Sequence, residues 1–497
     1  MNSNQINKVV IVGGGTAGWM AAAAVSRLIG ANLDITLIES DAIGTIGVGE
    51  ATIPTFLTLH RLLKIDEAEF MARVNGTFKL GISFEGWLRA DHDYVHSFGY
   101  TGQGCWAAGF QHFWTRGSVQ GMSHPYGRYS PEMMALQDNR FSLSSQNPLN
   151  YAYHIDATEY AQFLRSLAQR AGVKRVEGKI VSVGQHASGF IKEVILESGT
   201  CINGDFFIDC SGFYGLLADK TLGTAFDDWS QWLPCNRAVA VQTEAVRPSV
   251  PYTRAIARSA GWQWQIPLQH RVGNGLVFDA NSLSDDEARH QLLNSVEGRV
   301  LTEPRVIKFR TGQRVKHWAK NCVALGLAAG FLEPMESTSI HLIQRGIIRL
   351  MQMFPSMGIR QADEDEFNRQ MSEEFLFIRD FIIMHYHLNR RDESPFWSDL
   401  AHMSVPEALQ HRLDLFRETG NVFQKQGDVF GENSWTQVMM GQGILPKTYH
   451  PIVDMMQAAE FEQFMAVQRA KVDQALVNMP KHADFVAQYC PGNLSKN

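Results

Sequence analysis

Residues 8–39 read KVVIVGGGTAGWMAAAAVSRLIGANLDITLIE, and this stretch decides the fold. The apolar run Lys8 to Val12 predicts a strand that ends at a glycine turn. An alanine-rich helix is predicted from about Thr16 to Ile29, and a second strand from Asp34 to Ile38. Strand, glycine turn, helix and strand in this order are typical of the βαβ unit that opens a parallel, dinucleotide-binding sheet.

The turn itself has the spacing Gly13-x-Gly15-x-x-Gly18, and Glu39 ends the next strand. Glycines let the backbone approach a pyrophosphate, and the helix N-terminus supplies N–H donors. A carboxylate at the end of the second strand can accept hydrogen bonds from a ribose. The expected contacts with the dinucleotide are Gly13, Gly15, Thr16, Ala17, Gly18 and Glu39. An ordinary tight turn is the alternative interpretation, and the motif alone does not separate FAD from NAD.

Two later strands run into glycine-containing turns in the same way. The apolar run 206–208 leads into Asp209, and the run 322–325 leads into Gly326. Three such junctions so far apart favour one sheet assembled from discontinuous segments. Their places are similar to those where FAD monooxygenases of the p-hydroxybenzoate hydroxylase type close over the flavin, although Leu327 replaces the usual Asp of the last junction. Two further strand ends in a large α/β fold are the alternative.

The expected fold class is α/β with α+β insertions. It combines a discontinuous Rossmann-like FAD-binding module, a substrate-binding module and a mainly helical C-terminal region. Outside the strand-to-glycine junctions, the sequence changes from an aromatic-rich stretch to strand-like alternation and then to helical spacing. The expected boundaries are 1–83, 151–234 and 311–345 for the FAD-binding module, 84–150 and 235–310 for insertions that form a sheet and the substrate pocket, and 346–497 for the helical region that completes the pocket.

The charge and cysteine content narrow the class of protein. The 497 residues carry 45 basic and 51 acidic side chains, a formal net charge of −6, without a basic block, so a nucleic-acid partner is not expected. The six cysteines form no Cys-x-x-Cys pair, no secretory leader is recognised, and no apolar run has the length of a membrane span. The expectation is therefore a reduced, cytoplasmic enzyme without a metal site or a membrane partner.

The segment Glu336-Ser337-Thr338-Ser339 directly precedes a helical run that starts at Ile340. The unpaired N–H groups at a helix start, together with the positive end of the helix dipole, favour a small anion. Read locally, the favoured interpretation is instead an N-cap, in which the hydroxyl of Ser337 or Thr338 caps the helix. The two interpretations are compatible, because a cap can also bind an anion.

Two other local patterns are ambiguous. Trp262 and Trp264 lie on one face of a predicted strand, for which core packing is the default explanation. Lys79 stands between Phe78 and Leu80. Most lysines in such a setting extend their amine to solvent, whereas a buried lysine is nucleophilic. Read locally, the solvent-exposed amine is the favoured interpretation.

Together these motifs resemble the flavin-dependent tryptophan halogenase family over most of the chain. The turn at 13–18 is similar to the family's FAD motif, and residues 47–54, GVGEATIP, resemble the strap beside its flavin. The segment Trp262-x-Trp264-x-Ile266-Pro267 is similar to the tryptophan pair that distinguishes halogenases from related hydroxylases by keeping the substrate away from the flavin. Lys79 matches the family's catalytic lysine, and residues 336–338 match its Glu-Ser-Thr segment.

The resemblance implies an FADH2-dependent halogenase. A separate flavin reductase supplies the reduced FAD, which with O2 and chloride or bromide yields hypohalous acid. Lys79 then holds this acid or becomes a haloamine, and it delivers the halogen to an electron-rich arene. Glu336 stabilises the cationic ring or removes its proton. The backbone N–H groups of Thr338 and Ser339 are the halide site that the family implies, although Gly commonly stands there in place of Ser339.

The family also implies contacts with the substrate. His96 and Phe98 resemble its His-x-Phe pair that sandwiches the indole, while residues 430–435, FGENSW, only loosely resemble the lid that grips free tryptophan. No set of side chains for an α-amino acid is apparent, so the expected aromatic substrate is an indole or another electron-rich arene that lacks the amino-acid group or is larger than tryptophan. The remaining contacts implied by the family are Ser337 and Trp435 for the substrate, and Gly49, Ala51, Asp209, Gly326 and Leu332 for the cofactor.

Two rival functions stay open at this point. A flavin monooxygenase would hydroxylate its substrate, but it needs that substrate beside the flavin, so Lys79 and the tryptophan pair argue against it. The second rival is a non-catalytic protein that stores or shuttles reduced FAD. The resemblance to the halogenase family also suggests a homodimer.

Overall fold

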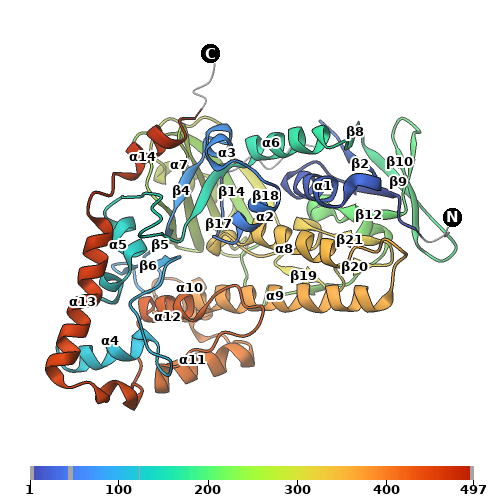
Figure 1. Ribbon diagram of the computed structural model, residues 1–497. Helices are drawn as coiled ribbons and strands as arrows, with labels where there is room; N and C mark the ends of the chain where they lie inside the picture. Colours follow the sequence, from blue (N-terminus) through green and yellow to red (C-terminus); the bar gives the residue numbers. More distant parts are fainter. Residues whose placement is uncertain (1–4, 43–48, 123, 493–497) are drawn as a thin grey trace. The chain divides into compact units, whose positions relative to one another are not determined.

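The computed structural model describes residues 5–42, 49–122 and 124–492, which form two compact units (Figure 1). The first unit comprises Met1–Asn75, Ile155–Asn236 and Lys308–Leu376, and the second comprises Gly76–His154, Arg237–Ile307 and Phe377–Asn497. Of the strap expected at residues 47–54, Gly47 and Val48 lie outside the described residues. The division into three parts expected from the sequence, with its own boundaries, stays a prediction.

The first unit is built on a mainly parallel sheet that contains the βαβ opening. β1 (Lys8–Val12) lies between β2 (Asp34–Glu39) and β12 (Phe206–Asp209), and the strand order is β20-β21-β12-β1-β2-β8. The edge strands are β8 (Lys174–Glu177) and β20 (Trp318–Ala319), and β21 (Cys322–Ala324) lies between β20 and β12. The predicted α/β sheet assembled from discontinuous segments is confirmed, since β1, β12 and β21 come from distant parts of the chain.

Helices and a small antiparallel sheet cover this parallel sheet. α1 (Thr16–Leu28) lies beside α6 (Ala157–Arg170) and also packs on α8 (Ser339–Gln352) (Figure 1). Four consecutive alanines, residues 21–24, are wholly buried in α1, and their small side chains allow this close packing. Val10 and Val12 of β1 pack in one core cluster with apolar residues of the sheet β11-β10-β9. The remaining elements of this unit are β3 (Gly49–Ala51), α2 (Phe56–Leu62), α3 (Glu67–Arg73), β9 (Ile180–Gln185), β10 (Ile191–Leu196), β11 (Cys201–Asn203), β13 (Phe226–Asp228), β19 (Gly312–Arg314) and β22 (Gly330–Phe331).

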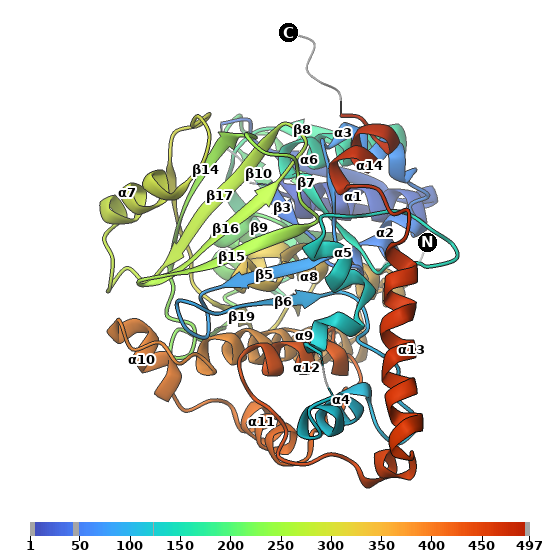
Figure 2. The same ribbon diagram turned by 90° about the vertical axis from the view of Figure 1, so that its left-hand side faces the viewer.

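The second unit is built on a seven-stranded sheet with the order β18-β14-β17-β16-β15-β5-β6 (Figure 2). β14, β17, β16 and β15 pair antiparallel in turn, and β15 pairs parallel with β5. The strands expected within residues 235–310 are therefore confirmed. The bounds are β5 (Gly81–Glu85), β6 (Asp93–Ser97), β14 (Arg237–Glu244), β15 (Tyr252–Arg258), β16 (Gly261–Pro267), β17 (Arg271–Phe278) and β18 (Arg305–Lys308).

One helix covers part of this sheet. α7 (Asp285–Ser295) buries Ala288 and Leu292 against four apolar side chains of β14 and β17. The helix begins with a capping box, because the Ser284 hydroxyl accepts from the Glu287 N–H while the Glu287 carboxylate accepts from the Ser284 N–H. Local capping and apolar spacing thus agree on where this helix starts and which face it buries.

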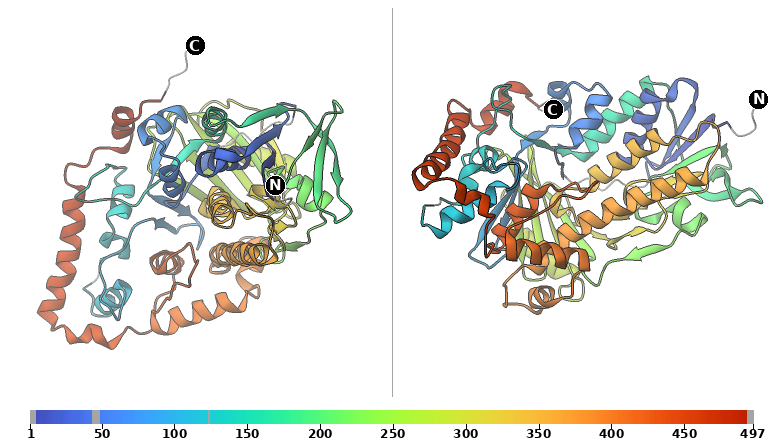
Figure 3. Two further views of the ribbon diagram at one scale, coloured as in Figure 1. Left: turned by 45° about the vertical axis from the view of Figure 1, so that its right-hand side comes forward. Right: turned by 60° about the horizontal axis from the view of Figure 1, so that its bottom comes forward.

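A short strand pair and a set of helices complete the second unit. β4 (Thr77–Lys79) pairs antiparallel with β7 (Ala152–Asp156), so that Lys79 lies opposite Ala152. The long helix α13 (Ala458–Leu476), red in the figures, runs beside α5 (Pro131–Gln137) (Figure 3). The other helices of the second unit are α4 (Phe110–Val119), α10 (Pro395–His402), α11 (Glu407–Thr419), α12 (Glu432–Gly441) and α14 (His482–Tyr489). The long helix α9 (Gln361–His387) belongs to the first unit up to Leu376 and to the second unit from Phe377.

The chain after residue 340 is mainly helical, as its apolar spacing predicts. Among the residues that the structure describes, none of the helices combines the length and the apolar character needed to cross a bilayer.

Candidate active site

The glycine turn after β1 has a shape that leaves the start of α1 open. Gly13 has φ +107, and a Cβ on it would lie 2.2 Å from a backbone oxygen of the second strand-to-glycine junction. A Cβ on Gly18 would lie 1.8 Å from the Gly13 oxygen, so close packing requires glycine at both positions. A Cβ on Gly15 would meet nothing within 4 Å among the described residues. Gly15 is the N-cap of α1, and Thr16 and Ala17 belong to its first turn, so the first N–H groups of α1 have no partner within the helix.

Glu39 lies at the end of β2, directly beyond this turn. A Cβ on Gly14 would lie 1.5 Å from the Glu39 Oε2, so the carboxylate lies against the glycine turn. Trp19 Nε1 donates to Oε2 at 3.2 Å, and Arg175 Nε donates to Oε1 at 2.5 Å. Arg165 Nη1 is 3.5 Å from the same Oε1. These partners fix the carboxylate beside the glycine turn, and the two arginines could not have been assigned from local sequence.

Asp209 ends β12 and is wholly buried. Its Oδ1 accepts from the backbone N–H and the hydroxyl of Ser211, at 3.0 and 2.6 Å. Its Oδ2 accepts from the N–H groups of Leu217 and Ala218, both at 2.8 Å. Both carboxylate oxygens therefore hold the chain that follows the strand, a structural role that the sequence did not suggest. The expected contact of Asp209 with the cofactor stays a prediction.

The third junction lies close to the first and the second. Gly326 has φ +63, and a Cβ on it would lie 2.8 Å from the Ala17 Cβ. The turn η5 (Gly326–Ala328) also packs against the turn η3 (Gly212–Tyr214) of the second junction. The carboxyl ends of β1, β12 and β21 thus meet, which is where ligands bind in open parallel sheets. The other residues expected to contact the cofactor are Gly49 and Ala51, which lie in β3, and Leu332, which is buried.

The segment before α8 differs from the predicted cap. Glu336 is wholly buried, and Ser337 has a left-handed backbone with φ 59. The N-cap residue of α8 is Thr338, with φ −92 and ψ −7, and its side chain makes no capping hydrogen bond among the described residues. The predicted side-chain cap is therefore wrong, because an N-cap hydroxyl reaches the first-turn N–H groups from an extended backbone. The first N–H groups of α8, from Ser339 on, lie at the positive end of the helix dipole and receive no capping hydrogen bond from the Thr338 side chain.

Lys79 is wholly buried in the second unit. Its Nζ lies 5.1 Å from the centroid of the Phe98 ring, within the range of a cation–π contact. The Phe98 N–H donates to the Leu80 oxygen at 2.9 Å, which aligns the two segments. The solvent-exposed amine favoured by the local sequence is wrong, since long-range packing encloses the side chain. Lys79 and Phe98, which were expected at one site, are brought together.

The segment that carries Phe98 is held by α12. Gln437 Oε1 accepts from the Ser97 N–H at 2.8 Å, and Gln437 Nε2 donates to the Gly99 oxygen at 3.3 Å. Asn433, one helical turn earlier, accepts from the Thr101 N–H and also donates to the Gly99 oxygen. These two amides lie on one face of the helix and fix the backbone on both sides of Phe98.

Aromatic side chains surround His96 in the second unit. The Phe381 and Phe430 rings stack with centroids 3.8 Å apart, and His96 lies 5.5 Å from the first and 6.1 Å from the second. Trp435 meets Phe381 edge to face at 4.8 Å, and the Arg412 guanidinium lies 3.9 Å from the Trp435 centroid. His96 and Trp435, both expected at the substrate, therefore belong to one aromatic cluster. Phe381 and Arg412 carry no local signal that would have identified them.

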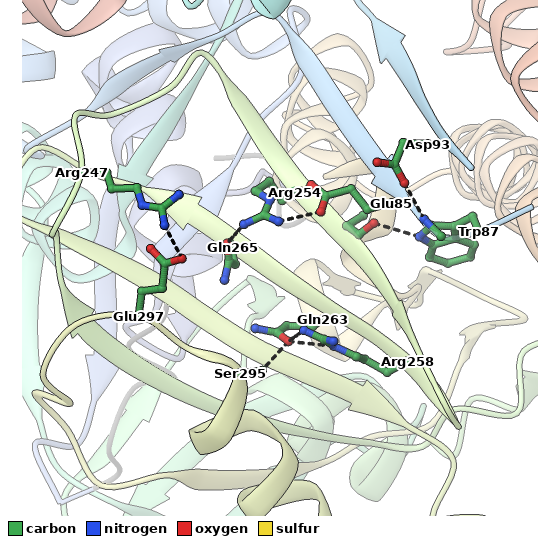
Figure 4. Close-up of polar contacts among 12 residues, drawn as sticks. Glu85, Trp87, Asp93, Arg247, Arg254, Arg258, Gln263, Gln265, Ser295 and Glu297 are labelled. Carbon is green, nitrogen blue, oxygen red and sulfur yellow. Dashed lines mark hydrogen bonds and ion pairs between the residues drawn. The ribbon is translucent and has the colours of Figure 1, made fainter. Parts of the chain in front are cut away.

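The two tryptophans of β16 are buried on one face of the sheet, with ring centroids 6.1 Å apart. A Cβ on Gly275 of β17 would lie 2.0 Å from the Trp264 ring, so the indole lies across that glycine. The alternate residues Gln263 and Gln265 point to polar partners, and Figure 4 shows them hydrogen-bonded to arginines of β15. The predicted alternation is confirmed, and it accounts for both faces of the strand.

The structure assigns the expected site residues to two groups. The glycine turn after β1, Glu39, Gly326 and the Glu336 to Ser339 segment belong to the first unit. Lys79, His96, Phe98 and Trp435 belong to the second unit. Among the described residues, no group of three or more His, Cys, Asp or Glu side chains is arranged to hold a metal ion.

The chain is similar to known proteins over nearly its whole length. A family model described as tryptophan halogenase matches residues 8–458. The chain is 33% identical to tryptophan 7-halogenase RebH of Lentzea aerocolonigenes, over 98% of this chain and 99% of that protein. It is 31% identical to tryptophan 6-halogenase SttH of Streptomyces toxytricini, over 98% and 99% of the two chains.

Two solved structures are similar over nearly the whole chain. The flavin-dependent halogenase Xcc4156 from Xanthomonas campestris is 52% identical with a TM-score of 0.97, covering 99% of this chain and 100% of that one. The flavin-dependent halogenase BrvH from Brevundimonas sp. BAL3 is 43% identical with a TM-score of 0.93, covering 98% and 100%.

Proposed function

Because the chain belongs to the tryptophan halogenase family, we propose that the amine of Lys79 directs the halogen in the reaction that it catalyses. The chain is a flavin-dependent halogenase that acts on an electron-rich arene. The observation that supports the role of Lys79 is its complete burial with Nζ 5.1 Å from the Phe98 centroid. An amine enclosed beside an aromatic ring can keep a reactive halogen species away from bulk water while an arene approaches.

The flavin is proposed to be FAD. The open start of α1 at Gly15 fits a pyrophosphate, and the fixed carboxylate of Glu39 fits a ribose. When bound in its reduced form, FAD supplies hypohalous acid from O2 and halide. The proposed contacts are Gly13, Gly15, Thr16, Ala17, Gly18, Glu39, Gly49, Ala51, Asp209, Gly326 and Leu332. A separate flavin reductase is the proposed source of FADH2, and a homodimer is the proposed assembly.

The halide, chloride or bromide, is proposed to bind the backbone N–H groups of Thr338 and Ser339. Two features support this site: α8 starts at Ser339, and its N-cap residue provides no side-chain cap among the described residues. The positive end of the helix dipole favours an anion at that place.

The transfer step is proposed to use two side chains. Lys79 holds hypohalous acid by hydrogen bonding, or as a haloamine formed with loss of water, while an arene carbon attacks the halogen. The oxygen–halogen or nitrogen–halogen bond breaks as the carbon–halogen bond forms. The ring proton then leaves to the carboxylate of Glu336, which also stabilises the cationic ring. The products are the aryl halide and water.

The substrate is proposed to be an indole or another electron-rich arene without an amino-acid group, bound by His96, Phe98, Ser337 and Trp435. Support comes from the polar side chains on both sides of Phe430. Asn433 and Gln437 are hydrogen-bonded to the segment of Phe98, and the carboxylate of Asp428 is paired with Arg412 at 3.1 Å. These groups are used within the protein, whereas an α-amino acid needs partners of both charges.

One assay tests this function against a hydroxylase. The protein is supplied with FAD, a flavin reductase, NADH, bromide and indole, and the products are analysed by mass spectrometry. The expected product shows the bromine isotope doublet. An oxygenated product without halogen would instead identify a hydroxylase, and flavin turnover without either product would identify a reduced-flavin carrier.

A further inference from the structure

The strand that carries Lys79 is fixed at every residue from Gly76 to Leu80. Gln269 Nε2 donates to the Gly76 oxygen at 2.7 Å, and the Leu80 N–H donates to the Pro251 oxygen at 2.7 Å. Between them, β4 pairs with β7. All these contacts lie within the second unit. The backbone on both sides of Lys79 is therefore held by contacts that do not involve the Lys79 side chain.

Next to Lys79, a chain of hydrogen bonds runs from β15 to the end of β16. The Thr77 hydroxyl is 2.7 Å from the Pro267 oxygen and 2.9 Å from His154 Nδ1, and His154 Nε2 is 2.9 Å from the Thr253 hydroxyl. A carbonyl oxygen only accepts, so the Thr77 hydroxyl donates to Pro267 and must accept from the His154 Nδ1–H. The other ring nitrogen then accepts from Thr253. With a neutral ring, each of these three hydrogen bonds therefore has a defined donor and a defined acceptor.

The charge state of His154 agrees with this direction. Burial, then the charge of Lys79 and then that of His482, lower the pKa of His154 well below its ordinary value. A neutral ring has one N–H and one acceptor nitrogen, which is the set that Thr77 and Thr253 require. It also avoids a second positive charge near the lysine.

A second histidine holds the next residue of β4. The Phe78 N–H donates to His482 Nε2 at 3.2 Å, and His482 Nδ1 donates to the Ser249 oxygen at 2.9 Å. The Phe78 ring stacks on Phe141 with centroids 4.3 Å apart and meets Phe485 of α14 edge to face at 5.5 Å. The C-terminal helix α14 therefore anchors the strand of Lys79 at Phe78, because His482 binds the Phe78 backbone N–H and Phe485 packs against the Phe78 ring.

We propose that Thr77 and His154 are positioning residues for Lys79, and that they work by joining β4 to the carbonyl of Pro267. This inference rests on the proposed role of Lys79. It gives the segment Trp262-x-Trp264-x-Ile266-Pro267 a second task, because the end of that strand fixes the strand of the lysine. Halogen transfer needs the amine within a fraction of an ångström of its place, and a displacement of about 1 Å can lower a rate by about a hundredfold.

The test compares two substitutions of Thr77. Thr77→Val keeps the shape of the side chain and removes the hydroxyl, whereas Thr77→Ser keeps the hydroxyl and removes the methyl group. Each variant receives reduced FAD, O2, bromide and indole with excess methionine, which converts escaped hypobromous acid into countable methionine sulfoxide. Bromoindole then reports halogen that the protein directs, and thermal unfolding reports the fold.

Thr77→Val is expected to keep the sum of the two products within about twofold and to lower the ratio of bromoindole to sulfoxide by about tenfold or more. Thr77→Ser is expected to stay near the wild-type ratio. A wild-type ratio in Thr77→Val overturns the proposal, because the hydroxyl would then not be needed. An equal fall in both variants also overturns it, because the ratio would then not depend on the hydroxyl.

Two further variants keep the result interpretable. If Thr77→Val does not fold, Thr253→Val, which removes the hydroxyl hydrogen-bonded to His154 Nε2, is expected to lower the same ratio, and an unchanged ratio overturns the proposal. Lys79→Ala in the same assay separates the proposal from its premise. If Lys79→Ala keeps the wild-type ratio, the proposed role of the lysine fails; if it loses bromoindole while Thr77→Val does not, only the positioning role fails.

Discussion

The Nζ of Lys79 lies 5.1 Å from the centroid of the Phe98 ring. The two residues come from neighbouring segments, β4 and the turn after β6, which are joined by the hydrogen bond from Phe98 to Leu80. A desolvated contact of this kind contributes about 2 kcal/mol, enough to hold a flexible lysine side chain in one orientation. The relationship explains how a side chain with four rotatable bonds can act at one place.

Removal of the amine should separate the two halves of the reaction. Lys79→Ala is expected to bind flavin and to form hypobromous acid at the wild-type rate, while bromoindole falls by about a hundredfold or more, because the amine proposed to direct the halogen is lost. Bromoindole and methionine sulfoxide, measured together, check this. Lys179→Ala, at an exposed position, is the control and should leave both products unchanged.

Phe98 should act through its aromatic face. Phe98→Leu is expected to lower bromoindole formation by about tenfold, since it removes the ring beside Nζ and the aromatic surface for the arene. Phe98→Tyr keeps the face of the ring and should retain most of the activity. Steady-state rates over a range of indole concentrations give the measurement. Equal activity of the leucine and tyrosine variants would show that the aromatic face is not used.

The carboxylate of Glu336 should matter for the chemical step. Glu336→Gln is expected to lower bromoindole formation by about a hundredfold, since a positioned proton acceptor contributes factors of about 10² to 10⁴. Sulfoxide from escaped hypobromous acid should rise in proportion. Glu333→Gln is a matched control, because Glu333 is also wholly buried and lies three residues away. A similar loss in both variants would indicate a shared effect on folding.

Substitutions of two glycines in the first turn should affect different properties, flavin affinity in one case and stability in the other. Gly15→Ala adds a methyl group where the described structure has open space, so the fold should persist while flavin affinity falls by about tenfold or more. Gly18→Ala forces a Cβ to 1.8 Å from the Gly13 oxygen, so the protein itself should lose stability. Flavin fluorescence titration and thermal unfolding distinguish the two outcomes. A Gly15→Ala variant with wild-type affinity would argue against a pyrophosphate at this turn.

Stability should fall on the acid side because of neutral buried histidines. Burial lowers the pKa of His482 from 6.5 to about 4, although its two backbone hydrogen bonds raise it. Between these values the unfolded chain binds more protons than the folded one, so the contribution is complete above pH 6.5 and is lost as the pH falls towards 4. The loss for His482 is about 3 kcal/mol, at about 1.4 kcal/mol for each pH unit.

Denaturant unfolding at several pH values between 4 and 7.5 measures this slope. His482→Gln is expected to reduce it, because the titrating group is removed while an amide oxygen can still accept from Phe78. His186→Gln changes an exposed histidine and should leave the slope as it is. An unchanged slope in His482→Gln would contradict the assignment of a neutral ring.

Local sequence was sufficient for much of the fold. Apolar runs, a glycine turn and alanine-rich helical spacing predicted β1, α1 and β2, because strand, turn and helix preferences act over a few residues. Alternation predicted β16 with its two buried tryptophans for the same reason. The motifs also indicated the class of enzyme.

Local sequence failed where the outcome depended on distant partners. The segment before α8 has the composition of an N-cap, yet Thr338 adopts a backbone from which its hydroxyl does not cap. The carboxylate of Asp209 accepts four hydrogen bonds from the chain that follows it, a structural role that local sequence did not suggest, while its contact with the cofactor stays a prediction. In both cases the hydrogen bonds depend on the folded backbone and not on the residue type alone.

Lys79 shows the same division most clearly. The sequence by itself determined its identity and its place between two apolar neighbours, which favoured an exposed amine. Only the tertiary structure decided that the amine is buried beside Phe98 and that its strand is held by His482, which is 404 positions from Phe78. The physical reason is that burial and hydrogen-bond partners are set by contacts between segments far apart in the chain, which no local pattern records.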